Sequence, residues 1–106
     1  GEYEEAEGRL RAFLAADPGS SLEADAIYWI AECLRARGRY REAIAEYRSV
    51  VDLRPPGDLA ARALYGIALA WRSLGDDEAA RQALSDLVRD FPASDVAALA
   101  RQRLQE

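Results

Sequence analysis

The chain has 106 residues, a net charge of −5, a single cysteine and no histidine. This length suits one domain, and the acidic balance argues against the basic face that nucleic-acid binding requires. Without histidine the usual general base is absent, and one cysteine cannot form a His/Cys metal cluster. No apolar run approaches the roughly 18 residues of a membrane span. We therefore expect no enzyme activity, metal or cofactor, and no direct membrane insertion.

The strongest pattern is a repeat with a step of 37 residues. Gly-Glu-Tyr-Glu-Glu-Ala at 1–6 returns as Gly-Arg-Tyr-Arg-Glu-Ala at 38–43 and, more diverged, as Gly-Asp-Asp-Glu-Ala-Ala at 75–80. The same step separates Pro18, Pro55 and Pro92. A period of roughly 20–50 residues is typical of stacked supersecondary units rather than of one globular core.

In chain order, the first two predicted helices cover residues 2–16 and 20–37. The first opens with three glutamates, which suit the positive end of a helix dipole. The second begins at Ser20, which has capping-box spacing from Glu23. Apolar residues between 24 and 34 recur at helical spacing, and Gly38 can take the left-handed conformation that ends a helix. The three residues beyond the usual repeat length are expected to lengthen this kind of helix by about one turn.

The other predicted helices cover residues 39–53, 58–74, 76–90 and 94–105. Very short turns join neighbouring helices, which favours antiparallel packing. The sequence thus predicts an all-α fold, an α-solenoid of about six helices in antiparallel pairs. Residues 1–106 form a single domain, expected to divide into a partial unit 1–18, full units 19–55 and 56–92, and a capping helix 93–106. The partial unit starts at the second helix of a pair, so we expect an uncapped apolar face around Leu10, Phe13 and Leu14.

Small residues are predicted to line the helix contacts. Ala6, Ala43 and Ala80 fall early in the second helix of each unit, and Ala31 and Ala68 fall midway along the first. Small side chains at facing positions let two helices approach to about 8 Å.

The middle repeat resembles the tetratricopeptide repeat. That family has a small residue, an aromatic, Gly-x-Tyr-x-x-Ala, a second aromatic and a proline, which correspond here to Ala31, Leu34, Gly38, Tyr40, Ala43, Tyr47 and Pro55. Two residues depart from the pattern: Leu34 replaces the usual tyrosine, and Asp77 replaces the tyrosine of the third unit. The resemblance implies a non-catalytic scaffold for protein–protein interaction.

Three segments narrow the resemblance further. They are Ala-Ile-Tyr-Trp-Ile-Ala-Glu at 26–32, Phe-Pro-Ala-Ser at 91–94 and Ala-Arg-Gln-Arg-Leu at 100–104. They are similar to the C-terminal repeat domain of the Tol-Pal accessory family, which coordinates cell division in the bacterial envelope. Outer-membrane assembly lipoproteins share the Pro-x-Ser turn. This likeness implies a periplasmic setting, with a cytoplasmic one left open.

By analogy with the family, the first helix of each unit lines a concave groove that binds a protein or peptide segment. The groove residues expected on this basis are Asp25, Tyr28, Glu32, Arg35, Arg62, Tyr65, Leu69 and Arg72. The Tyr28/Tyr65 and Arg35/Arg72 pairs are each 37 residues apart, so their members are expected to be neighbours. Tyrosine and arginine are common in interaction hot spots, and two arginines could bind a partner's carboxylate.

The same residues could instead have a purely structural role, without binding a partner. Arg35 and Arg72 lie near helix ends, where solvated arginines are favourable without a ligand. Tyr28 and Tyr65 could simply pack on the neighbouring helix. Trp29 could anchor a partner, but packing against the next unit opposite Gly66 is the expectation. Cys33 is expected to be an inert packing residue.

Two other functions compete with the groove hypothesis. The chain could be a structural spacer or self-assembly module, associating through the uncapped first helix. It could also be an accessory domain of a larger enzyme.

Overall fold

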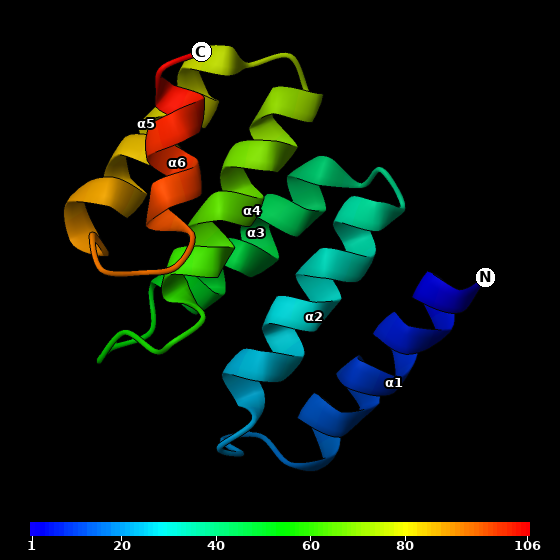
Figure 1. The fold of residues 1–106 in the computed structure, drawn as a ribbon. Helices are drawn as coiled ribbons and strands as arrows, with labels where there is room; N and C mark the ends of the chain where they lie inside the picture. Colours follow the sequence, from blue (N-terminus) through cyan, green and yellow to red (C-terminus); the bar gives the residue numbers. More distant parts are fainter.

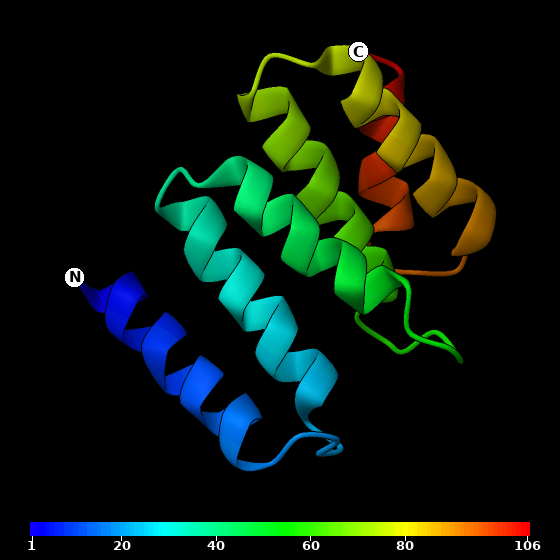
Figure 2. The same cartoon turned by 180° about the vertical axis from the view of Figure 1, so that it is seen from behind.

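The computed structural model describes all of residues 1–106, and it contains six α-helices and no β-strand. The helices are α1 (Glu2–Ala16), α2 (Glu23–Ala36), α3 (Tyr40–Val51), α4 (Ala60–Ser73), α5 (Asp77–Asp90) and α6 (Ala97–Leu104). Each helix packs against the next one along the chain, and α2 also touches α4 (Figures 1 and 2). The result is an extended stack measuring 43 × 30 × 17 Å, which confirms the predicted all-α solenoid.

Glycines end the first helix of each pair, as the sequence predicts. Gly38 has φ 79° and Gly75 has φ 84°, a conformation that a side chain would strain. The chain reversal lets the Arg39 N–H donate to the Leu34 carbonyl at 2.9 Å, and the Asp76 N–H donate to the Trp71 carbonyl at 3.0 Å. These bonds satisfy carbonyls that a helix end leaves free, so the two reversals have the same geometry.

The starts of the first helices differ from the prediction. A tight turn precedes each of them, in which Glu23 N–H donates to the Ser20 carbonyl at 3.0 Å and Ala60 N–H to the Gly57 carbonyl at 3.2 Å. The Glu23 carboxylate accepts from Gly19 N–H at 2.9 Å, one turn before the helix. The additional residues of the repeat therefore form this turn, and α2 and α4 have only 14 residues each. The expected longer helices were wrong.

Small residues fill the helix contacts of the core. Ala31, Ala43 and Ala80 are fully buried, and Ala68 is nearly so. Because these side chains are short, neighbouring helices approach closely. Larger residues occupy the layers beside them: Ile30, Leu34, Tyr47, Val50, Ile67, Leu84 and Leu87.

The ring of Tyr47 on α3 lies directly against the backbone of α4 at Gly66. A Cβ added to Gly66 would lie 2.4 Å from Cζ of Tyr47, far inside van der Waals contact. Tyr47 is fully buried, and three atoms of its ring would lie within 3 Å of the added Cβ, so the ring or the helix would have to shift. Glycine at position 66 is therefore required by the close approach of the two helices.

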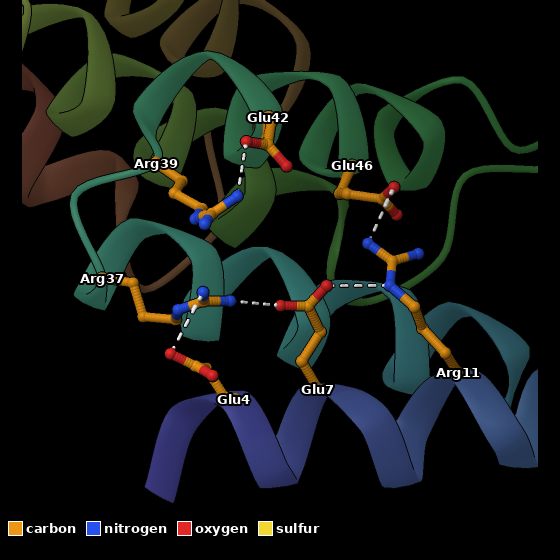
Figure 3. Close-up of polar contacts among 7 residues, drawn as sticks. All are labelled: Glu4, Glu7, Arg11, Arg37, Arg39, Glu42 and Glu46. Atoms are coloured by element: carbon orange, nitrogen blue, oxygen red, sulfur yellow. Dashed lines mark hydrogen bonds and ion pairs between the residues drawn. The ribbon is translucent and has the colours of Figure 1, made fainter. Parts of the chain in front are cut away.

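Helix α1 is attached differently, because it has no fully buried residue. Arg37, which follows α2, reaches Glu7 at 2.8 Å and Glu4 at 3.4 Å. Arg11 of α1 contacts Glu7 at 2.8 Å and Glu46 of α3 at 3.8 Å. Figure 3 shows these side chains bridging α1 to the α2–α3 pair. Charged contacts thus hold one flank of α1, whereas the other helices are held mainly by buried apolar residues.

Replacing two helical glycines by alanine tests the close approach at Gly66. We expect Gly66→Ala to destabilise the fold by about 1–3 kcal/mol through overpacking against Tyr47. The matched control is Gly8→Ala on α1, where the added Cβ meets nothing within 4 Å. Alanine has the higher helix propensity, so the control should stabilise by up to about 1 kcal/mol. Thermal or urea unfolding measures the stability of both variants. If Gly66→Ala and Gly8→Ala changed the stability by the same amount in the same direction, the packing of Tyr47 against Gly66 would be contradicted.

Candidate functional site

A hollow of about 190 Å³ lies between α2 and α4. Tyr28, Glu32 and Arg35 line it from α2, and the segment before α6 adds Val96. The other lining residues belong to α4: Arg62, Tyr65, Gly66 and Leu69. The hollow therefore offers two phenols, two guanidinium groups and one carboxylate within a partly apolar wall. We call it the α2–α4 groove.

A buried tyrosine supports the floor of this groove. The Tyr47 phenol donates a hydrogen bond to Glu32 and accepts one from Arg35 Nε at 3.0 Å. Arg35 also contacts the Glu32 carboxylate at 3.2 Å. Burial and the hydrogen bond to Glu32 raise the pKa of Tyr47. Burial lowers the pKa of Arg35, but its bonds to Tyr47 and Glu32 outweigh that effect and raise it. The three side chains hold one another in place.

Residues from the end of the chain fix the opposite wall. Arg103 of α6 donates from Nε to the Tyr65 hydroxyl at 2.6 Å, and its guanidinium lies 5.7 Å from the centre of the same ring. Arg62 contacts Asp95 at 2.7 Å, and both side chains are more than half exposed. An exposed pair of this kind contributes little to stability, so Arg62 remains available to exchange one carboxylate for another.

Six of the eight residues predicted for the groove line this one hollow. Asp25 lies instead at a different hollow, beside Leu10 and Phe13 of α1. Arg72 also lies outside the groove and contacts Glu106 at 3.4 Å. Arg35 and Arg72 therefore do not line the same hollow, and the binding of one carboxylate by both arginines stays a prediction. Both arginines already contact carboxylates of this chain.

The tyrosines of the groove do not form the expected neighbouring pair of rings. Tyr28 packs edge-on against Trp29, with ring centres 5.4 Å apart, and against Tyr47 at 5.9 Å. Tyr65 lies instead beneath Arg103. Burial and the nearby Glu32 carboxylate raise the pKa of Tyr28. The two tyrosines share the groove without stacking on each other.

The expectation that Trp29 packs opposite Gly66 was wrong. The space beside Gly66 is filled by Tyr47, and Trp29 is 55% exposed. Trp29 and Gly66 are 37 residues apart and occupy the same position in their repeats. Each therefore faces the second helix of the preceding unit: Gly66 faces α3, and Trp29 lies at a hollow beside α1.

Sequence reasoning missed three residues of the site. The sequence identifies Tyr47 only as the second aromatic of the repeat pattern, and its hydroxyl contact with Glu32 and Arg35 crosses between two helices. Val96 and Arg103 were assigned only to the capping helix. The repeat step offered one signal, because Arg103 falls 37 residues after Gly66, at the position that faces the preceding unit.

Two further observations concern other kinds of site. Cys33 is buried, as expected of a packing residue, and burial raises the pKa of its thiol. No three acidic, histidine or cysteine side chains cluster as metal ligands would. None of the six helices combines the length and the apolar character that crossing a membrane demands.

Removing the Tyr47 hydroxyl tests the support of the groove floor. Because the folded-state pKa of Tyr47 is raised above the unfolded value of about 10, its contribution is complete below pH 10 and is lost as pH rises through the folded pKa. Above pH 10 the wild type should lose about 1.4 kcal/mol of unfolding free energy per pH unit more than Tyr47→Phe. Near pH 7, Tyr47→Phe should cost about 1 kcal/mol.

The measurement is urea unfolding at a series of pH values. Tyr3→Phe is the matched control, because it removes a phenol that is 53% exposed, and it should keep the slope of the wild type. If the free energy of unfolding fell equally steeply with pH above pH 10 in wild type and Tyr47→Phe, the Tyr47 phenol would not be making the hydrogen bonds described here.

Comparison with known proteins gives one clear match. The tetratricopeptide repeat family matches residues 1–58 and, in an overlapping register one repeat later, residues 38–95. No curated protein matches the chain. Repeats of this family generally mediate protein–protein interactions, and their fold is typically a scaffold without enzyme activity. The match covers most of the chain and has the register of the 37-residue repeat, so the chain belongs to the tetratricopeptide repeat family.

Proposed function

We propose that the chain is a protein-interaction scaffold whose α2–α4 groove binds a segment of a partner protein. The observation that carries this proposal is the gathering of Tyr28, Tyr65, Arg35 and Arg62 around one hollow. Aromatic and arginine side chains supply most of the binding energy at many protein interfaces. Three of these side chains are pre-positioned by Tyr47, Glu32 and Arg103, which lowers the entropy lost on binding.

The proposed setting is the bacterial cell envelope, in a role of the Tol-Pal, cell-division or outer-membrane assembly type. The support is the similarity of residues 26–32, 91–94 and 100–104 to the Tol-Pal accessory family. In this proposal the protein is periplasmic and the groove takes a segment of an envelope protein.

A structural or self-assembly role is the second candidate. Three of the five exposed large apolar side chains lie close together in the sequence of helices: Tyr3 is on α1, Leu22 lies just before α2, and Trp29 is on α2. Such clusters often mark association surfaces. Sedimentation equilibrium over a wide concentration range tests this role, because a strict monomer would exclude self-assembly.

Titration calorimetry with soluble fragments of Tol-machinery proteins tests the groove proposal. We expect Arg62→Glu to weaken binding by about tenfold or more, because Arg62 is the groove arginine with an exchangeable partner. The matched control is Arg48→Glu on α3, which makes the same charge change at an exposed residue outside the groove. Thermal melts verify that both variants are folded. Equal affinity of the two variants, or no binding by the wild type, would contradict the proposal.

A further inference from the structure

Arg62 lines the α2–α4 groove, but the carboxylate that it contacts lies outside this groove. Its Nη2 atom contacts Asp95 at 2.7 Å, and the two side chains are 51% and 67% exposed. Asp95 does not line the groove. It lines a separate hollow of about 510 Å³ between the segment before α4 and the segment before α6. Asp95 therefore holds Arg62 from outside, and the groove side of the guanidinium stays accessible to a second carboxylate.

The turn that carries Asp95 is closed by its own backbone hydrogen bonds. Within it, Ser94 N–H donates to the Phe91 carbonyl at 3.1 Å, and Ala97 N–H donates to the Ser94 carbonyl at 3.1 Å. Neither bond involves Arg62. Asp95 can therefore release Arg62 while the turn before α6 stays formed.

The preceding repeat shows that the fold does not require this ion pair. Asp25 and Asp58 lie 37 residues before Arg62 and Asp95, and both line one hollow of about 300 Å³. Two carboxylates thus occupy the positions that the next repeat gives to an arginine and an aspartate. The turn before α4 still forms, with the same closing hydrogen bond at 3.2 Å. The contact between Arg62 and Asp95 is an addition at one place in the stack.

We propose that Asp95 competes with the partner for Arg62, so that a bound segment replaces the Asp95 carboxylate with an acidic residue of its own. This inference rests on the binding role proposed for the α2–α4 groove. The contact between Arg62 and Asp95 uses one guanidinium nitrogen, whereas an arginine binds a carboxylate best through two parallel hydrogen bonds. Two carboxylates close together repel each other. The segment's carboxylate therefore displaces Asp95 and does not join it.

The competition affects only segments that carry a carboxylate. An acidic segment has to break the contact between Arg62 and Asp95 before it gains its own, whereas a neutral segment leaves that contact in place. Exposed ion pairs of this kind are weak, so the competition lowers the affinity for an acidic segment by about two- to fivefold. Asp95 thus limits how strongly the groove prefers acidic segments over neutral ones.

Fluorescence anisotropy with labelled synthetic peptides tests this competition on the intact chain. The peptides contain leucine, tyrosine and serine with one glutamate, which is moved through every position, and a second set has glutamine in its place. We expect the wild type to prefer the best glutamate peptide over its glutamine counterpart, because Arg62 can bind the carboxylate. Asp95→Asn should increase this preference by about two- to fivefold, and Arg62→Gln should abolish it.

The matched control is Asp52→Asn, which removes the same charge from an exposed residue at the end of α3, outside the groove. It should leave the preference unchanged. The preference is a ratio of two affinities measured on one protein, so partial unfolding of a variant cannot alter it.

Two kinds of failure can be told apart. If peptides bind but glutamate and glutamine are equivalent, or if Asp95→Asn leaves the preference unchanged or smaller, the competition is overturned and the binding role of the groove stands. If no peptide of either set binds the wild type or Asp95→Asn, the binding role itself is contradicted, and the competition with it.

Discussion

The position of Tyr47 is the constraint on which the middle of the stack depends. Its ring lies against Gly66 of α4, and its hydroxyl binds Glu32 and Arg35 of α2. One buried side chain on α3 therefore determines how closely α4 approaches and how two charged residues of the groove are held. A polar group in a core is stable only when its hydrogen bonds are satisfied, and here Glu32 and Arg35 supply them. Core packing and groove geometry are thus two consequences of the same contact.

Burial in this solenoid depends on the neighbours of a helix more than on its own sequence. Helices α1 and α3 share a repeat pattern, yet α3 has a buried apolar face and α1 has none. In a stack, each unit contributes its own stability and its contacts with adjacent units. Arg37 and Glu7 partly compensate at α1, because their contact is largely shielded from solvent, with the two side chains 20% and 16% exposed. The Arg37–Glu4 and Arg11–Glu46 contacts each include a more exposed side chain and contribute less. Because α1 also has no buried residue, it is held more weakly than the inner helices.

The repeat made most of the fold predictable from the sequence. Gly38 and Gly75 marked the helix ends because only a left-handed residue allows the reversal found there. The helix starts were less predictable, since Ser20 and Glu23 can form a turn before a helix as readily as a cap on it. The groove was predicted by position within the repeat, which places six of the eight residues around one hollow. Asp25, near the start of α2, lines a different hollow beside α1, and Arg72, near the end of α4, contacts Glu106 instead.

Trp29 shows why residue type alone could not separate packing from exposure. A tryptophan at helical spacing among apolar residues is usually buried, and the sequence placed it opposite a glycine that leaves room for a large ring. The repeat step contradicts that pairing, because two residues at the same repeat position face different neighbours. Gly66 meets the large Tyr47, and Trp29 meets the smaller Leu10, which is 37 residues before Tyr47. At the contact between α1 and α2 the large residue, Trp29, lies on α2. At the contact between α3 and α4 the large residue, Tyr47, lies on α3.

The charges of the α2–α4 groove limit the kind of segment that would fit the binding role proposed for it. Arg35 is held by Glu32 and Tyr47, and removing one member of such a partly buried network leaves the others unsatisfied. A partner carboxylate would gain little there. Arg62 differs, because its contact with Asp95 is exposed and can be exchanged at small cost. The groove is therefore suited to a segment that places one acidic residue at Arg62 and apolar or aromatic side chains along Tyr28, Tyr65 and Leu69.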